Sequence, residues 1–169
     1  MKLLVVRHAV AQERGEFAAT GLPDDFRPLT DAGRRKMHRA ARGLRALVPH
    51  VDELASSPLV RARQTAEILA DRWGGHEIVG VGELAPESQP DALVPWLRGH
   101  GAAATVAVVG HEPHLGFLVG WLLAGRHVSF LELKKGGACL LEFDDPPSAG
   151  GATLRWVMEP RHLRRLGRG

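Results

Sequence analysis

Short apolar runs of strand length alternate along this chain with longer segments of helical periodicity. Residues 2–6 (KLLVV) and 105–109 (TVAVV) are the clearest strands, because each is a mainly apolar run that stops at a polar residue or a glycine. Thr30 is a candidate N-cap for a helix over residues 31–47. The expected strands are 2–6, 51–55, 77–81, 105–109, 138–143 and 153–158, and the expected helices are 31–47, 57–73, 90–98 and 113–124.

Strands that alternate with helices indicate an α/β protein. We predict a three-layer α/β/α sandwich with a largely parallel central sheet, to which the last two strands add an antiparallel edge. The length of 169 residues suits one domain with its own core. We expect this domain to span residues 1–158 and to be followed by a solvated basic C-terminal tail at residues 159–169.

The net charge of +3 comes from that tail. Residues 159–169 hold four arginines against Glu159, whereas the remaining 158 residues hold 18 basic and 18 acidic side chains. Aromatic residues make up 5% of the chain and tyrosine is absent, so the sequence offers no stacking platform for single-stranded nucleic acid. We therefore expect no nucleic-acid partner.

The cysteine content and the hydropathy of the sequence indicate the cellular compartment in which we expect the protein. The single cysteine, Cys139, excludes an intramolecular disulfide and a multi-cysteine zinc site, and its apolar surroundings predict a buried thiol. No apolar stretch approaches the roughly 20 residues that cross a bilayer. Arg7 and His8 interrupt the apolar start too early for a signal peptide. We expect a cytoplasmic protein with no membrane partner, and the sequence leaves its oligomeric state open.

Four polar residues stand at the carboxyl ends of predicted strands. Arg7 and His8 follow the first strand, Arg61 lies just past the second, and His111 follows the TVAVVG strand. In open α/β sheets this edge forms the ligand-binding crevice. Arginine can hold phosphate oxygens through two parallel hydrogen bonds. Each residue alone also fits a structural role, as a solvated helix arginine or a capping histidine, but their shared position predicts a phosphate pocket.

The motifs around these residues resemble those of the histidine phosphatase superfamily, whose phosphoglycerate mutase-like members carry Arg-His-Gly after the first strand. The matching blocks are LLVVRHAVA, RPLTDAG, SSPLVRARQTAEIL and VVGHEPHL, and they extend over most of residues 2–120 in the family's order. The short chain is similar to the SixA-type phosphohistidine phosphatases, which lack the long inserted cap of the mutases. One departure is Ala9, where the superfamily usually has glycine.

The resemblance implies roles for individual residues. His8 matches the nucleophile, and Arg7, Arg61 and His111 match the phosphate pocket. Arg27, in RPLTDAG, lies in a block that approaches the rim of the pocket, together with the loop of residues 11–26. Glu83, in GELAPES, matches the position of the proton donor in many members, although an exposed loop carboxylate is the alternative interpretation.

The implied reaction is hydrolysis of a phosphomonoester or phosphoramidate through phospho-His8. We expect one nitrogen of His8 to donate to a backbone carbonyl, which fixes the attacking tautomer, and a protonated His111 to support the arginines. No cofactor or metal is expected, although His111 and His114 could form a metal pair. The predicted substrate is a phosphohistidine-bearing protein. A small phosphorylated metabolite, or an inactive phosphate-binding module, are the alternatives.

Overall fold

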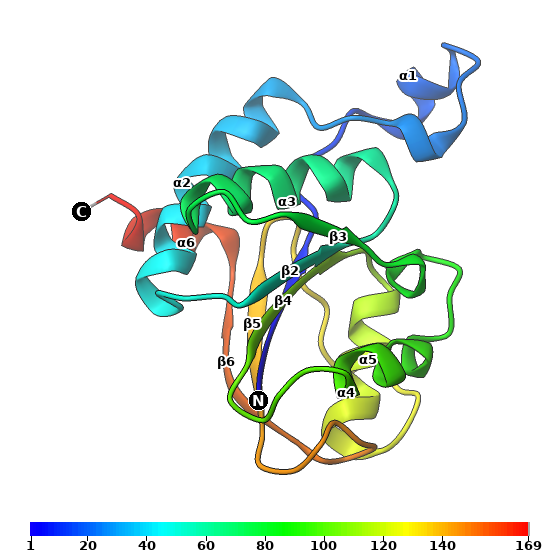
Figure 1. The fold of residues 1–169 in the computed structure, drawn as a ribbon. Coiled ribbons are helices and arrows are strands. Elements are labelled where there is room, and N and C mark those ends of the chain that lie inside the picture. Colours follow the sequence, from blue (N-terminus) through cyan, green and yellow to red (C-terminus); the bar gives the residue numbers. More distant parts are fainter. Residues whose placement is uncertain (169) are drawn as a thin grey trace.

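The computed structural model describes residues 1–168 and contains a six-stranded sheet flanked by helices (Figure 1). The strands are β1 (Lys2–Arg7), β2 (Glu53–Ser56), β3 (Ile78–Gly80), β4 (Thr105–Gly110), β5 (Ala138–Phe143) and β6 (Ala152–Met158). The α-helices are α1 (Arg14–Ala18), α2 (Asp31–Leu47), α3 (Val60–Arg72), α4 (Val94–Arg98), α5 (His114–Ala124) and α6 (Pro160–Leu166). Three short 3₁₀ helices are η1 (Asp24–Phe26), η2 (Gly82–Leu84) and η3 (Pro90–Leu93).

The strand order in the sheet is β3-β2-β4-β1-β5-β6. Strands β3, β2, β4 and β1 are parallel to one another, whereas β5 is antiparallel to both β1 and β6. The predicted parallel sheet with an antiparallel edge is therefore confirmed. Strand β1 lies between β4 and β5, so both sides of its backbone are hydrogen-bonded.

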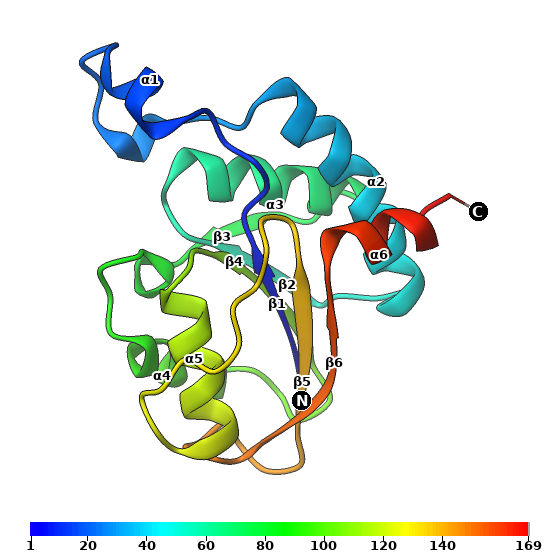
Figure 2. The same cartoon turned by 180° about the vertical axis from the view of Figure 1, so that it is seen from behind.

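Helices cover both faces of the sheet and make a three-layer sandwich, as predicted (Figures 1 and 2). Helices α2, α3 and α6 lie on one face, and α4 and α5 lie on the other. Successive side chains of a β-strand point to opposite faces of the sheet, and the residues of β1 follow this rule. Leu4 and Val6 join the cluster under α2 and α3, whereas Leu3 and Val5 join the cluster under α5. No separate cap domain is present in residues 1–168.

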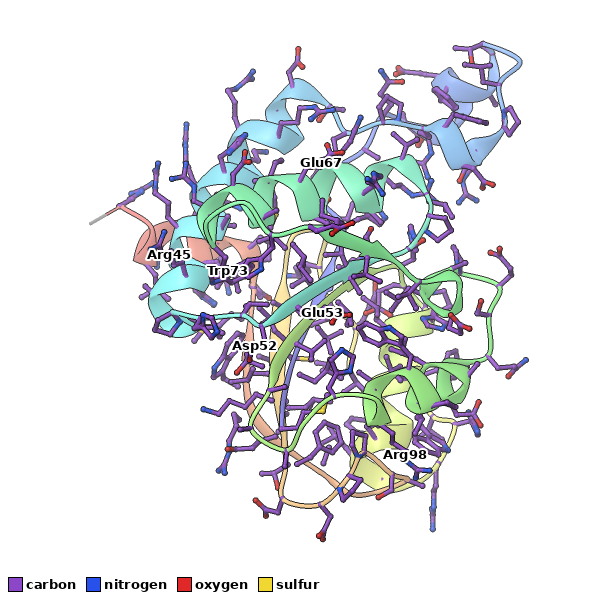
Figure 3. The ribbon with its side chains drawn as sticks, in the orientation of Figure 1. Arg45, Asp52, Glu53, Glu67, Trp73 and Arg98 are labelled. Atoms are coloured by element: carbon purple, nitrogen blue, oxygen red, sulfur yellow. The ribbon has the colours of Figure 1, made fainter. Side chains whose placement is uncertain are left out.

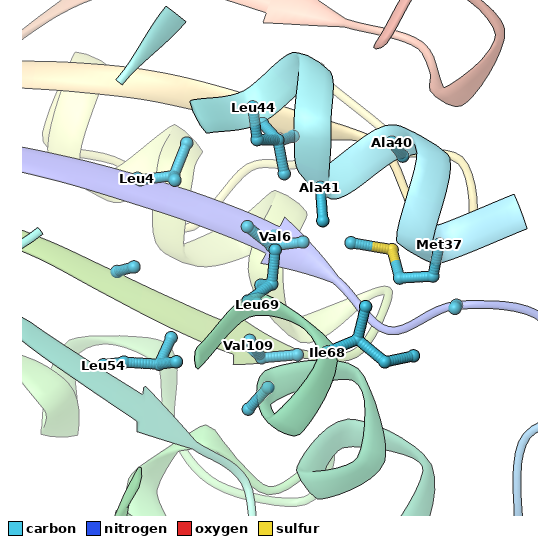
Figure 4. Packing of buried hydrophobic residues seen from close by; sticks show 14 of the residues in the cluster. Leu4, Val6, Met37, Ala40, Ala41, Leu44, Leu54, Ile68, Leu69 and Val109 are labelled. Carbon is cyan, nitrogen blue, oxygen red and sulfur yellow. The ribbon is translucent and has the colours of Figure 1, made fainter. Parts of the chain in front are cut away.

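The core beneath α2 and α3 is built from small and branched side chains (Figure 4). Ala40 and Ala41 let α2 approach the sheet closely, while Met37 and Leu44 fill the space on either side of them. Thr30 caps this helix through its Oγ1, which accepts a hydrogen bond of 2.9 Å from the amide of Gly33. The helix predicted over residues 31–47 therefore has its predicted cap and bounds.

Polar contacts join the elements at the amino end of the sheet, away from the strand ends that carry Arg7 and His8 (Figure 3). Asp52 precedes β2, and its Oδ2 accepts a hydrogen bond of 2.7 Å from the Thr105 amide at the start of β4. Trp73 follows α3, and its Nε1 donates at 2.9 Å to the carbonyl of Val48 at the end of α2. The carboxyl end of the sheet thus remains the edge at which a site can form.

The C-terminal region differs from the expected solvated tail. Residues 160–166 form α6, which packs on α2 and buries Leu163 completely. Arg42 of α2 also donates a hydrogen bond of 2.8 Å to the carbonyl of Gly167. Three arginines remain at the surface, but the apolar side of the segment joins the core beneath α2; Gly169 lies outside the described residues.

Two further findings concern the cysteine and the helices as a group. Cys139 is a free, buried thiol in β5, and burial raises its pKa to about 12, as expected for an inert core cysteine. Within residues 1–168 we find no helix with the length and apolar character needed to pass through a bilayer.

Candidate active site

A cavity of about 630 Å³ opens at the carboxyl end of the sheet. Four of the predicted site residues line it, namely Arg7, His8, Arg27 and Arg61. The segment from Ala11 to Glu16 also contributes to its wall, as expected for a rim formed by residues 11–26. The structure therefore brings together residues that are up to 54 positions apart in the sequence.

His8 follows β1, and its backbone is held on both sides. Its amide donates to the carbonyl of Gly110 at 3.0 Å, and its own carbonyl accepts from the amide of Gly136 at 3.1 Å. The Nδ1 atom lies 2.7 Å from the carbonyl oxygen of Ala9, to which it donates as an N–H. This contact is the predicted one, and it leaves Nε2 with a lone pair.

Burial is the main reason that the pKa of His8 falls to about 4. The nearby charges of Arg61, Arg7 and Lys135 lower the pKa further, while the hydrogen bond to Ala9 opposes the fall. At neutral pH the ring is therefore uncharged. A neutral imidazole with a free Nε2 lone pair is the form that can attack phosphorus.

His111 follows β4 and lies beside His8, with the two ring centroids 5.1 Å apart. Its Nε2 is 2.9 Å from the Oγ of Ser57. Burial, together with the charges of His8 and Arg61, lowers the pKa of His111 to about 2. His111 is therefore uncharged at neutral pH in the substrate-free site, mainly because it is buried, and its expected protonated form beside a bound phosphoryl group stays a prediction.

Arg61 and Arg27 share one carboxylate. Asp24 Oδ2 lies 3.1 Å from NH2 of Arg61, and Asp24 Oδ1 lies 2.7 Å from Nε of Arg27. NH1 of Arg61 also donates to the backbone carbonyl of Asp24 at 2.9 Å. The side chain of Arg61 is 4% exposed and that of Arg27 is 8% exposed. The negative charge of Asp24 therefore balances positive charge that solvent cannot reach.

Arg7 is held by the loop that leads into β5. Its NH1 donates at 2.5 Å to the carbonyl of Leu133 and lies 3.5 Å from Oε1 of Glu132. The Nε atoms of Arg7 and Arg61 are buried and have no hydrogen-bond partner among the described residues, and the same is true of Nδ1 of His111. Buried polar atoms are rarely left in that state.

Glu83, by contrast, is exposed in η2 and does not line the cavity. Its role as proton donor stays a prediction. Cavity residues that the sequence did not reveal are Lys135 and Glu112, and Asp24 is the missed partner of the arginines. The HEPH segment contains Glu112 directly after His111, which is the one signal that could have identified it.

The predicted alternative of a metal pair at His111 and His114 has no further ligands nearby. Among the described residues, no group of three or more histidine, cysteine, aspartate and glutamate side chains is arranged to hold a metal ion. His114 is buried, and burial lowers its pKa.

Comparison with known proteins agrees with the motifs and the fold. Residues 3–85 match the model of the histidine phosphatase superfamily, branch 1. An uncharacterised protein of Picosynechococcus is 39% identical over 140 residues, which cover 81% of this chain and 82% of the relative. Phosphohistidine phosphatase SixA of Escherichia coli is 26% identical over 171 residues, which cover 97% of each chain.

The chain belongs to the histidine phosphatase superfamily.

Solved structures share the fold of this superfamily member over nearly the whole chain. A structure of the protein histidine phosphatase SixA complexed with tungstate superposes with a TM-score of 0.81 at 24% identity, and covers 96% of this chain and 99% of its own. A phosphoserine phosphatase from Entamoeba histolytica in complex with phosphoserine gives a TM-score of 0.72 at 17% identity, with 96% and 98% coverage. Proteins with different substrates therefore share this fold.

Proposed function

We propose that this histidine phosphatase removes the phosphoryl group from a phosphohistidine-bearing protein in the cytoplasm, by way of phospho-His8. The observation that carries the proposal is the state of His8. Its Nδ1 hydrogen is committed to the Ala9 carbonyl, while Nε2 keeps its lone pair in a cavity lined by three arginines predicted to hold phosphate.

The buried donors around His8 supply what a phosphoryl group needs. Nε of Arg7 and Nε of Arg61 have no partner among residues 1–168, and phosphate oxygens would accept from both. A bound phosphate dianion would also favour the protonated form of His111, because opposite charges stabilise each other in a buried site. Charged donors of this kind act where negative charge develops in the transition state. We infer that they replace a metal ion and that no cofactor is needed.

The reaction takes place in two displacements. Nε2 of His8 forms a bond to phosphorus while the bond from phosphorus to the substrate nitrogen breaks, and the electron pair of that bond leaves with the substrate. Water then attacks phosphorus, the bond to Nε2 breaks, and inorganic phosphate departs as His8 regains its lone pair. The water proton passes to solvent or to a carboxylate, for which Glu83 is the predicted residue.

The alternative substrate is a small phosphorylated metabolite, which the structural similarity to the phosphoserine phosphatase favours. Metabolite enzymes usually enclose their ligand against several specific polar groups. In this chain the short segment around α1 forms part of the cavity wall, and no cap domain is present in the described residues. We therefore expect kcat/KM for a phosphohistidine protein to exceed that for common sugar phosphates by at least ~10²-fold.

The test uses His8→Ala, with His50→Ala as the matched control. His50 is exposed, and within residues 1–168 its one ion-pair partner is Asp52, at the opposite end of the sheet. We expect His8→Ala to lower phosphatase activity at least ~10³-fold, and wild-type protein quenched during turnover to carry acid-labile phosphate on His8, detected by mass spectrometry. Activity of His8→Ala within a few-fold of His50→Ala would contradict the covalent mechanism. Faster turnover of a sugar phosphate than of a phosphohistidine protein would support the metabolite alternative.

A further inference from the structure

A second cavity of about 500 Å³ adjoins the phosphate cavity. The two cavities share Arg7 and Glu112, which therefore stand at their junction. The other walls of the second cavity come from the loop between α5 and β5, including Ser129, Phe130 and Glu132. A group attached to a phosphate in the first cavity can extend into the second one past Arg7.

The loop that forms this cavity is closely packed on α5, and two glycines make the close approach possible. A Cβ atom at Gly116 would lie 2.3 Å from the Oγ of Ser129, and one at Gly120 would lie 1.7 Å from the carbonyl oxygen of Val128. Both distances are shorter than real Cβ contacts, so only glycine fits at these two positions of the helix. Figure 2 shows the loop running beside α5.

The same loop is fixed again at Leu133. Its amide donates to Oε1 of Glu112 at 2.8 Å, and its carbonyl accepts from NH1 of Arg7 at 2.5 Å. Phe130 lies between these attachment points, yet its side chain is 61% exposed. The exposed ring therefore belongs to a loop with a fixed path, and it lines the second cavity, where a ligand could contact it.

The charges of the second cavity differ from those of the first. Glu132 is largely exposed at 78% of its side chain, and its one ion pair in the described chain is the 3.5 Å contact with Arg7. Glu112 adds a second carboxyl group, whose pKa is raised by burial. Arg7 is the one cationic side chain of the described residues that lines the second cavity, whereas Arg27, Arg61 and Lys135 add positive charge only to the first. The second cavity therefore suits a phosphate less well and favours a neutral or cationic group that carries an N–H.

We propose that the second cavity is the subsite for the imidazole of the substrate phosphohistidine, with Phe130 against the ring and Glu132 accepting a hydrogen bond from the nitrogen remote from phosphorus. This inference rests on the proposed function. A proton on the remote nitrogen makes the ring an imidazolium. When the P–N bond breaks, its electron pair stays on the near nitrogen, and the imidazole leaves as a neutral molecule that keeps the remote proton. A carboxylate at the remote nitrogen favours the protonated ring, which is the form that can leave as neutral imidazole.

The test compares two substrates of the full-length protein, a phosphohistidine peptide and inorganic phosphoramidate. Phosphoramidate has the same phosphoryl group on nitrogen but no ring. We expect Glu132→Gln and Phe130→Ala each to lower the ratio of kcat/KM for the peptide to kcat/KM for phosphoramidate by about tenfold. Glu77→Gln, which makes the same charge change at an exposed glutamate near β3, and Leu154→Ala, an exposed residue of β6, are the matched controls and should leave the ratio as it is in the wild type.

The outcomes separate the two proposals. If the wild type hydrolyses phosphoramidate but not the peptide, the phosphohistidine function is wrong and the imidazole subsite is wrong with it. If the wild type hydrolyses both and the ratio is unchanged in Glu132→Gln and Phe130→Ala, only the subsite is wrong. A fall in the ratio in these two variants, with no fall in the controls, supports the subsite.

Discussion

Ala9 shows how a single residue can depart from the superfamily pattern without changing the chemistry beside it. Its amide donates to Oγ1 of Thr65 at 3.0 Å, and its carbonyl accepts from His8. No residue other than glycine has a positive φ in the described chain, so this position does not require the conformational freedom of glycine. The methyl group is buried, and the backbone still holds His8, the proposed nucleophile.

The lowered pKa of His8 predicts the acid limb of the pH–rate profile. In the proposed mechanism the neutral ring of His8 attacks, and protonation removes its lone pair, so kcat/KM should fall only as the pH drops through about 4 rather than through 6.5. The measurement is kcat/KM between pH 3.5 and 8 for the phosphohistidine peptide, corrected for ionisation of the substrate. A limb near 6.5 that persists after this correction would contradict the assigned environment of His8.

The sequence predicted best the helices and strands in which apolar residues form a clear run or recur at a regular spacing. The strands of β1 and β4 and the helix α2 appear at or within one residue of the expected bounds. The sequence did not predict α1, η1 or α6. These segments are short and rich in charge, and their stability comes from contacts with distant residues, such as those of Asp24 with Arg61, rather than from local periodicity.

Helix α6 should contribute measurably to stability, despite its basic composition. Leu163 is fully buried against α2, so Leu163→Ala should lower the free energy of unfolding by about 2–4 kcal/mol. Leu166→Ala is the matched control, because this leucine of the same helix is 46% exposed. Urea unfolding followed by circular dichroism would measure both. Equal, small effects of the two substitutions would show that the segment behaves as the solvated tail expected from its charge.

At the scale of the whole molecule, the candidate site depends on segments from most of the chain. The sequence predicted the residues that directly follow strands or lie in the first turn of α3, because parallel strand ends meet at one edge of a sheet. It did not predict Lys135, which lies in a loop, or the contacts of Asp24, which lies in the short helix η1, because neither segment has a periodic pattern. The path of the loop that carries Lys135 depends on Gly116 and Gly120, whose importance appears only once α5 and the loop are packed together.

Burial of uncharged histidines predicts that acid destabilises the fold. His8 and His111 have pKa values of about 4 and about 2 in the folded chain, below the ordinary value of 6.5, so the unfolded chain binds more protons as the pH falls below 6.5. The stability is present above pH 6.5, and each histidine should remove about 1.4 kcal/mol per pH unit below it, until its folded pKa is reached.

The measurement is urea unfolding at pH 7.5, 6 and 5 in buffers without phosphate, which would bind the site. His111→Gln should show a weaker dependence on pH than the wild type, whereas His50→Gln, at an exposed position, should match the wild type. Depressed carboxylate pKa values, such as that of Asp24, affect stability only at lower pH and do not interfere in this range. A wild-type stability that stays constant from pH 7.5 to 5 would contradict the prediction.

The attachment of Leu133 to both Arg7 and Glu112 has a thermodynamic consequence. One residue accepts a hydrogen bond from the first side chain and donates one to the second, so the two side chains share a partner. Substitutions at positions that share a partner are not energetically independent. Their coupling free energy is typically about 0.5–3 kcal/mol. We therefore expect the effect of losing Arg7 to depend on whether Glu112 is present, which would couple the first cavity to its neighbour.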